Sequence, residues 1–257
     1  MYRLKNIITV FFLIILVNGS CKSVFRKDTS LTPQQYMGQG MPDCNKSWTE
    51  KDFQKAQNTI SSLIIKDFYL LPRKNSRKSG EVFKRIISKD NFDFLEDPTI
   101  SLREKAYRIQ ALGNMMGQMG SLYTNRSGTR QYYSEELIEL YVTHLFVRGK
   151  MLELAEKINK SSREEDVLMQ AGRNGIIGSY VFLITFLVSE QEKTGAFASM
   201  DLRKLSRELS NSIEDNKGYL DLESKQKIAS VIKKSIEKSP PNFIHKNYKK
   251  ILTLLAE

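Results

Sequence analysis

Acidic side chains at the starts of two predicted helices are the residues of this 257-residue chain that could do chemistry together. Two carboxylates on either side of a glycosidic bond can cleave it, one as a general acid and the other as a base or nucleophile. The candidates are Glu135, Glu136, Glu139, Glu164, Glu165 and Asp166. Most of them begin helices, where negative charge stabilises the exposed amides of the N-terminus. The pattern therefore favours a structural role and leaves cleavage of cell-wall glycan as the alternative.

The two histidines offer little for metal binding or nucleophilic catalysis. His144 falls on the apolar side of a predicted helix, and no second histidine or cysteine stands at ligand spacing from it. We expect a core or boundary histidine with one hydrogen bond. His245 lies among lysines and is expected to be solvated. The sequence predicts no metal site.

Common catalytic and cofactor motifs are absent from the sequence, which has no G-x-S-x-G elbow, Walker A loop, H-E-x-x-H, C-x-x-C or EF-hand loop. Gly113, Gly117 and Gly120 are spaced along a predicted helix and do not follow a strand, as a phosphate-binding turn would. Their spacing resembles the small-residue motif of membrane helices, but the neighbouring Asn114 and Gln118 favour close helix packing in a soluble domain. We expect no cofactor, and the sequence leans away from an enzyme without settling the question.

The N-terminus has the three parts of a secretory signal peptide. A basic start with Arg3 and Lys5 precedes an apolar stretch and then the small residues Gly19 and Ser20. The charge-free stretch from Asn6 to Ser20 is fifteen residues, about 22 Å as a helix, and falls short of a hydrocarbon core of roughly 30 Å. The sequence therefore predicts export, with an uncleaved membrane anchor as the weaker alternative.

Cys21 follows these small residues directly, and residues 16–21, Leu-Val-Asn-Gly-Ser-Cys, resemble the lipobox of bacterial lipoprotein precursors. The resemblance implies that residues 1–20 are a signal peptide cut off before Cys21. It also implies that the Cys21 thiol carries fatty acyl chains such as palmitate and anchors the protein in the bacterial cell envelope. Asn18 stands where a lipobox usually has Leu, Val or Ile, so ordinary signal-peptidase cleavage and a soluble periplasmic or secreted product remain the alternative.

Cys44 is the only other cysteine of the chain. If Cys21 carries lipid, Cys44 has no internal disulfide partner. If Cys21 is free, a Cys21–Cys44 bridge is the alternative in an oxidising compartment. Residues 21–46 are polar, contain glycine and proline and show no sustained apolar period, so we expect a flexible tether there.

From residue 47 onward the apolar residues recur with the helical period of 3.6. Residues 47–50 have the form of a capping box that starts at Ser47, and the helix they begin is expected to end before Pro72. Further helices are expected at 80–88, 101–122, 134–155 with a bend at 148–150, 162–188, 201–213, 222–238 and 243–257. The sequence contains no repeated motif with a period of 34 or 40 residues. Residues 47–257 are predicted to form one all-α domain of seven or eight helices, as a bundle or as stacked helix pairs.

The most apolar part of the body lies in a stretch from Asn174 to Ser189, sixteen residues without a charge. We expect residues 175–188 to form a central helix that is buried on all sides. A membrane-inserting segment is the sharper alternative, and the β-branched residues leave a strand as a minor one.

The net charge of +11 is unevenly distributed along the chain. Residues 72–89 hold seven basic residues and one acidic residue, and residues 225–250 hold eight basic residues and one acidic residue. Such segments could contact anionic lipid headgroups or acidic cell-wall polymers, although a solvated lysine-rich surface is the simpler interpretation. The predicted export argues against nucleic acid as a partner.

Together these features predict a lipid-anchored protein of the bacterial cell envelope with a helical binding or structural domain. One alternative is a secreted or periplasmic enzyme that acts on cell-wall polymers through helix-borne carboxylates. Another is a membrane-interacting protein that uses residues 175–188. The protein partner and the membrane leaflet are not indicated by the sequence.

Overall fold

A computed structural model describes residues 28–125, 132–158, 163–192, 197–238 and 240–256. These residues form nine α-helices, three short 3-10 helices and no strand. The all-α class is confirmed, and so are the eight helices at the upper end of the range expected after residue 47. The minor alternative of a strand within residues 175–188 is wrong, because the whole segment is helical.

The helices differ in length from about two turns to eight. The α-helices are α1 (Pro33–Gly38), α2 (Glu50–Lys66), α3 (Gly80–Ile87), α4 (Leu102–Leu122), α6 (Ser134–Lys157), α7 (Arg163–Glu192), α8 (Ser199–Asn216), α9 (Leu222–Ile236) and α10 (Asn242–Ala256). The 3-10 helices are η1 (Phe68–Leu70), η2 (Lys89–Leu95) and η3 (Lys217–Tyr219).

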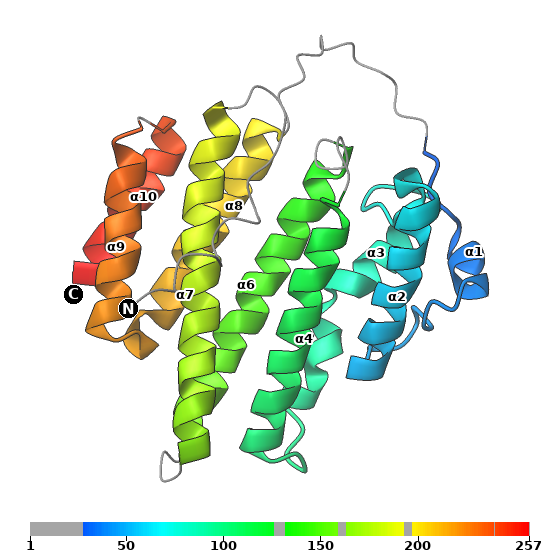
Figure 1. The fold of residues 1–257 in the computed structure, drawn as a ribbon, viewed down its shortest axis with the longest axis horizontal. Helices are drawn as coiled ribbons and strands as arrows, with labels where there is room; N and C mark the ends of the chain where they lie inside the picture. Colours follow the sequence, from blue (N-terminus) through cyan, green and yellow to red (C-terminus); the bar gives the residue numbers. More distant parts are fainter. Residues whose placement is uncertain (1–27, 126–131, 159–162, 193–196, 239, 257) are drawn as a thin grey trace, which may run out of the picture.

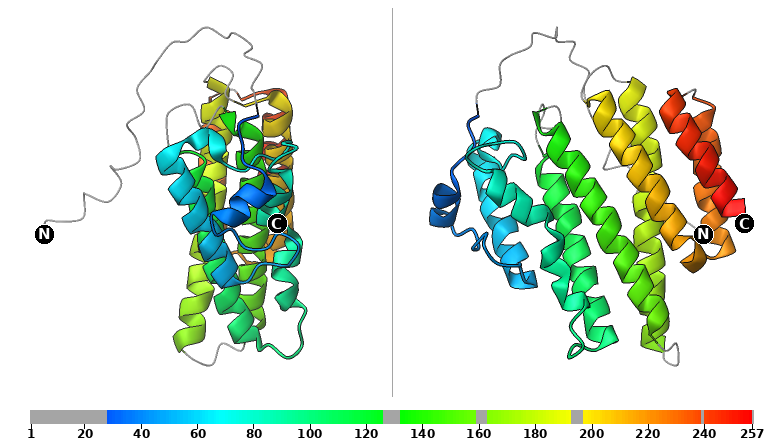
Figure 2. Two further views of the ribbon diagram at one scale, coloured as in Figure 1. Left: turned by 90° about the vertical axis from the view of Figure 1, so that its right-hand side faces the viewer. Right: turned by 180° about the vertical axis from the view of Figure 1, so that it is seen from behind.

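The helices stack in two layers that follow the chain along the long axis of the molecule (Figure 1). In one layer α3 contacts α6, α6 contacts α8 and α8 contacts α10. In the other layer α2 contacts α4 and α7 contacts α9, while α4 and α7 each pack extensively on α6. The edge-on view shows how thin this arrangement is (Figure 2). As a result α1 to α3 lie at one end of the molecule and α9 and α10 lie at the other.

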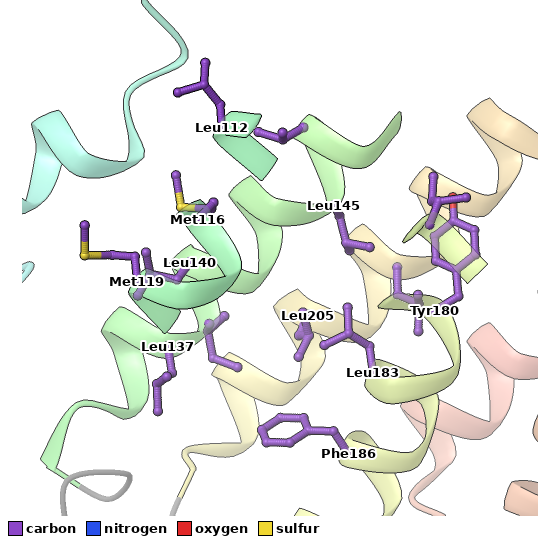
Figure 3. Packing of buried hydrophobic residues seen from close by; sticks show 14 of the residues in the cluster. Leu112, Met116, Met119, Leu137, Leu140, Leu145, Tyr180, Leu183, Phe186 and Leu205 are labelled. Carbon is purple, nitrogen blue, oxygen red and sulfur yellow. The ribbon is translucent and has the colours of Figure 1, made fainter. Parts of the chain in front are cut away.

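Large apolar side chains from four helices meet in the middle of this array (Figure 3). They are Leu112, Met116 and Met119 of α4, Leu137, Leu140 and Leu145 of α6, Tyr180, Leu183 and Phe186 of α7, and Leu205 of α8. Each of them exposes 3% or less of its surface. Full burial of one such side chain stabilises the fold by about 1.5–3 kcal/mol. The four central helices are therefore held together by one continuous core.

The three glycines of α4 face α6, as the close-packing interpretation requires. A Cβ atom at Gly113 would lie 3.2 Å from Cγ1 of Val147, and one at Gly117 would lie 3.6 Å from Cε1 of His144. Gly120 faces the next turn of α6 in the same way. Because these positions lack side chains, the backbone of α4 comes close to the side chains of α6.

Residues 28–46 are part of the folded domain, so the prediction of a flexible tether is wrong for this segment. It contains α1, and the Tyr36 side chain of α1 is completely buried. The Tyr36 hydroxyl donates a hydrogen bond to the backbone carbonyl of Leu70. A helix of six residues is too short to show a hydrophobic period, which explains why the sequence pattern did not reveal it. Residues 21–27, including Cys21, lie outside the described part of the chain.

The first long helix, α2, begins later and ends earlier than predicted. Thr49 is its N-cap: the Thr49 hydroxyl accepts a hydrogen bond from the backbone N–H of Asp52, whose carboxylate accepts one from the backbone N–H of Thr49. The capping box predicted at Ser47 is therefore wrong and is replaced by this one. The helix ends at Lys66 because Asp67 has an extended backbone, with φ −160° and ψ 123°.

The helix α6 continues without a break through residues 148–150, where the sequence predicted a bend. Gly149 serves a different purpose at this point. A Cβ atom there would lie 3.1 Å from Nδ2 of Asn216, at the C-terminal end of α8. The glycine therefore permits close contact between two helices of the same layer.

The helix α7 buries one broad side and exposes the other, so the prediction of burial on all sides is wrong. Within residues 174–189 the exposed positions are Asn174, Gly178, Phe182 and Thr185, and Phe182 exposes 50% of its surface. By length and composition the segment Val167–Glu190 could cross a membrane, but half of its most apolar window is buried in the domain. Its buried apolar side chains pack mainly against α6, α8 and α9, which lie on one side of α7.

Candidate functional site

The predicted carboxylates at the start of α6 contact the loop between η1 and α3. Glu136 accepts a hydrogen bond of 2.7 Å from the backbone N–H of Lys74. Glu139 binds the ammonium group of Lys74 and also that of Lys204, the latter at 2.7 Å. Glu135 contacts the same loop through a hydrogen bond from the Asn75 amide. These three carboxylates therefore join the loop and α8 to α6.

The side chains of the other three predicted carboxylates, Glu164, Glu165 and Asp166, lie outside the described part of the structure. They belong to the first turn of α7, which begins at Arg163. The structure therefore does not place them against the carboxylates of α6.

Glu136 and Glu139 lie one helical turn apart and have pKa values displaced in opposite directions. Burial raises the pKa of Glu136, against a hydrogen bond from the Lys74 N–H and the charge of Arg73. Burial also acts to raise the pKa of Glu139, but the hydrogen bonds and charges of Lys204 and Lys74 outweigh it and lower that pKa. The neighbouring ammonium groups decide the difference.

These opposite displacements predict opposite dependences of stability on pH. Glu139 binds its proton less tightly in the folded state, so its contribution is present at neutral pH and is lost as the pH falls through its lowered pKa. Glu136 binds its proton more tightly in the folded state, so stability falls as the pH rises above the ordinary glutamate value through its raised pKa. We expect E139Q to lower the free energy of unfolding by about 1–2 kcal/mol at pH 7, because two partly buried lysines lose their partner. E136Q should leave stability unchanged or raise it at that pH.

Urea unfolding of both variants at pH 4 and pH 7 measures the effect. The exposed Glu50→Gln variant is the control and should stay within about 0.5 kcal/mol of the wild type. Equal losses in E136Q and E139Q at pH 7 would show that the two sites do not differ as described.

His144 is the partly buried histidine with one hydrogen bond that the sequence predicts. Its Nε2 accepts a hydrogen bond of 3.0 Å from Nε of Arg148, one turn further along α6. Burial, together with the charge of Arg148, lowers the pKa of His144 to about 4, so the ring is neutral at pH 7. His245 is partly exposed on α10. In the described residues no group of three or more His, Cys, Asp or Glu side chains is placed to hold a metal ion.

Arg148 was not singled out by sequence reasoning except as part of a bend. The signals that could have found it are its spacing of four residues from His144 and the glycines of α4 and α7, which together make room for a large side chain on α6. Sequence alone does not show that these glycines and this arginine face one another.

Cys44 is half-buried and packs against the core next to the first loop of the domain. Its Sγ lies 3.8 Å from the backbone carbonyl oxygen of Pro42. Burial raises the pKa of the Cys44 thiol, which makes it a poor nucleophile at neutral pH.

Most basic residues of segment 72–89 make contacts within the domain. The Arg73 guanidinium lies 4.4 Å from the ring centroid of Tyr132 and donates a hydrogen bond of 3.1 Å to its hydroxyl. Arg85 donates a hydrogen bond of 2.9 Å to the backbone carbonyl of Cys44. These side chains stabilise the loop and α3, so few of the charges in this segment are free to meet an outside anion.

The lysines of segment 225–250 are arranged differently, because seven of the eight are exposed on or beside α9 and α10. They are Lys227, Lys233, Lys234, Lys238, Lys246, Lys249 and Lys250, and we call them the lysine surface. Within the described residues only Lys250 of this set forms an ion pair, at 2.6 Å with Glu214. The lysine surface lies on the last helix pair of the array (Figure 1).

A cavity of about 400 Å³ lies between α6 and α8, beside η3. Phe146, Glu153, Glu208, Asp215 and Tyr219 contribute to its wall. The ammonium groups of Lys150 and Lys157 bind Glu153 at 2.8 Å and 2.6 Å and lower its pKa. Glu153 is therefore ionised at neutral pH, which is the wrong protonation state for a general acid.

The structure thus contains a loop-binding carboxylate cluster at the start of α6, a cavity between α6 and α8, and a lysine surface on α9 and α10. Most basic residues of 72–89 make contacts within the domain, whereas most of those in 225–250 are exposed. Comparisons of the chain with protein-family models, with curated proteins and with solved structures find no match in any of the three.

Proposed function

We propose that this protein is a lipid-anchored component of the bacterial cell envelope whose α9–α10 end binds an acidic envelope polymer. The observation that carries the proposal is the lysine surface, with six lysines that have no ion-pair partner among the described residues. A concentration of unpaired positive charge attracts polyanions at long range and binds them through many weak contacts. A terminal helix pair also needs a polar outer side for solubility. A mixture of positively and negatively charged residues would serve that purpose as well as lysines alone.

The anchor is supported by the lipobox-like residues 16–21. The number of residues between Cys21 and the folded domain limits how far the domain can lie from such an anchor. Six residues lie between Cys21 and Asp28, where the described structure begins, so the two are seven residue steps apart. A fully extended chain spans at most about 3.3–3.6 Å per residue, so this connection reaches about 25 Å. A Cys21 anchor would therefore hold the N-terminal end of the domain close to the membrane.

The lysine surface lies at the end of the molecule opposite to this anchored end (Figure 1). With the N-terminal helices next to the membrane, α9 and α10 can extend away from it, because the long axis of the array separates the two ends. This arrangement favours a polymer of the envelope over the headgroups of the same membrane as the polyanion.

Metabolic labelling with a palmitate analogue tests the anchor. We expect label on the wild-type protein and none on Cys21→Ala. Equal labelling of the two proteins would contradict acylation at Cys21.

Binding to polyglutamate, as a model acidic polymer, tests the lysine surface. The protein used is the chain without its signal peptide, carrying Cys21→Ser. We expect a fourfold variant with Gln at Lys233, Lys234, Lys246 and Lys249 to bind about tenfold more weakly or worse, and wild-type binding to weaken as salt is raised. Each of these charges contributes on the order of 1 kcal/mol near a polyanionic surface.

A second fourfold variant provides the matched control. It carries Gln at Lys46, Lys51, Lys55 and Lys66, which are exposed on or beside α2 at the other end of the array. Both variants have the same net charge, so equal losses would show that only total charge matters. Binding of the wild type to vesicles with anionic headgroups but not to polyglutamate would point to the membrane in place of a polymer.

Neither alternative function gains a supporting observation from the described residues. The carboxylates of α6 bind Lys74, Asn75 and Lys204, and the apolar side chains of residues 175–188 are mostly in the core.

A further inference from the structure

Arg148 lies on α6 at the place where α4 and α7 flank that helix. Its Nε donates to Nε2 of His144 at 3.0 Å, and one terminal nitrogen, Nη2, donates to Oδ1 of Asn114 at 2.9 Å. A Cβ atom at Gly113 of α4 would lie 3.5 Å from the guanidinium carbon, and one at Gly175 of α7 would lie 3.1 Å from Nη1. Glycines on both neighbouring helices therefore leave room for the guanidinium, and two acceptors fix its orientation.

The guanidinium has no carboxylate partner in the described part of the chain. Both of its acceptors are neutral at pH 7, because Asn114 carries no charge and the pKa of His144 is about 4. Burial lowers the pKa of Arg148 itself, and no acidic group acts against this effect. A partly buried positive charge without a counter-ion costs free energy, since burial removes water and supplies no opposite charge. The fold thus keeps an unneutralised cation in a fixed position.

A partly exposed aromatic pair lies two helical turns from this cation. Tyr141 precedes Arg148 by two turns of α6, a distance of about 10 Å along the helix. The ring of Phe182 on α7 packs edge-on against Tyr141 with the centroids 5.5 Å apart, and half of Phe182 is exposed. Gly178 lies between Phe182 and Gly175 on α7, and a Cβ atom there would meet nothing within 4 Å. Gly178 therefore faces open space and adds no side chain next to Phe182, while His144 lies between Tyr141 and Arg148 on α6.

We propose that Arg148, Tyr141 and Phe182 form a binding site for a small amphiphilic organic anion. Its carboxylate or phosphate group pairs with the Arg148 guanidinium, whose Nη1 has no acceptor among the described residues. A guanidinium held in a fixed orientation suits the planar carboxylate and the phosphate group. The apolar part of the ligand lies on Phe182 and Tyr141, where burial of aromatic surface adds to the attraction. This site lies on the middle helices and does not depend on the lysine surface.

Titration of the signal-peptide-free Cys21→Ser chain with 3-phenylpropionate tests the proposal by calorimetry or by NMR. The neutral 3-phenylpropan-1-ol has the same apolar part, and phenyl phosphate replaces the carboxylate with a phosphate. We expect saturable binding of one or both anions and at least about tenfold weaker binding of the alcohol.

Variants of the site test which residues bind the anion. Arg148→Gln should weaken anion binding at least about tenfold. The exposed Arg77→Gln loses the same charge and should bind as the wild type does. Phe182→Ala should weaken the binding of 3-phenylpropionate and phenyl phosphate and should leave any binding of acetate unchanged.

The urea-unfolding midpoint of Arg148→Gln distinguishes a ligand-binding role of Arg148 from a structural one. Removal of an unneutralised charge predicts that Arg148→Gln has a urea midpoint equal to or above that of the wild type. The proposal is overturned if the wild type binds neither anion at millimolar concentration, or if Arg148→Gln binds them as well as the wild type does. If Arg148→Gln does not fold, the comparison of anion and alcohol on the wild type decides, and equal affinities for the two overturn the proposal.

Discussion

Replacing Tyr123 with alanine should lower the free energy of unfolding by about 3–5 kcal/mol, as expected for truncation of a fully buried aromatic side chain. Tyr123 is completely buried at the C-terminal end of α4. Its ring packs edge-on against Phe83 and Tyr133, with centroids 6.1 Å and 5.1 Å away. Its hydroxyl donates a hydrogen bond of 2.8 Å to the backbone carbonyl of Pro72. The side chain therefore joins α4, α6 and α3 to the loop after η1.

The Tyr123→Phe variant separates the hydrogen bond from the packing. It keeps the ring and leaves the Pro72 carbonyl without a donor, so a loss of about 1–3 kcal/mol is expected. Tyr69→Phe is the control, because Tyr69 is partly exposed at 39%, and it should change stability by less than about 0.5 kcal/mol. Urea unfolding measures all three variants. A loss below about 1 kcal/mol for Tyr123→Ala would contradict the packing described.

Leucine at Gly113 should destabilise the domain by about 2–3 kcal/mol, since it overfills a contact that is already close. A Cβ atom there would lie 3.2 Å from Cγ1 of Val147 and 3.5 Å from Cζ of Arg148, and the larger side chain has to displace one of them. Because α4 and α6 share the most extensive interface of the array, the strain cannot be relieved by moving a loop.

Alanine at Gly178 provides the matched comparison and should have the opposite sign. This position lies in the middle of α7, is exposed, and has nothing within 4 Å of the added Cβ atom. Alanine there should stabilise the domain by about 0.5–1 kcal/mol, because it reduces the backbone freedom of the unfolded chain. Destabilisation in Gly178→Ala, or no effect in Gly113→Leu, would show that the helix spacing differs from the one described. Urea midpoints of the two variants measure both effects.

The number and order of the long helices could be predicted because each of them buries one side along its own length. The apolar residues Phe53, Ala56 and Ile60 recur at helical spacing and are all completely buried in α2. The same holds for the stripes of α4 and α9. Because the buried positions recur along one helix, the apolar residues recur in the sequence with the same period. The helix can therefore be detected without knowing which helices pack against it.

The segment 28–46 shows where this signal fails. Its buried apolar side chains include Tyr36 and Met41, and the Tyr36 hydroxyl binds a carbonyl 34 residues further along the chain. These few positions show no helical period, and the polar residues around them resemble a linker.

The buried area of α7 was overestimated for a related reason. Composition shows that a segment is apolar, but only the packing of α7 against α6, α8 and α9 decides which of its sides is buried and that Phe182 is exposed.

The candidate sites depended still more on tertiary structure. The sequence indicated which carboxylates and lysines were present, but Glu139 lies 65 residues from Lys74 and 65 residues from Lys204. Only the packing of α6 against the loop and α8 makes these three residues an ion-pair cluster. The exposure of seven of the eight basic residues of 225–250 is likewise decided by how α9 and α10 pack on their neighbours.

The sequence by itself determined the all-α class, the helical body, and the residue types from which any site must be built, because these follow from composition and from burial that repeats along a helix. The export signal and the Cys21 anchor are predictions that rest on the sequence alone. Tertiary structure decided which charges are neutralised. Arg148 has neutral partners and two glycines beside it because three helices separated in the chain meet there, and the free energy of a charge depends on all the groups around it in space.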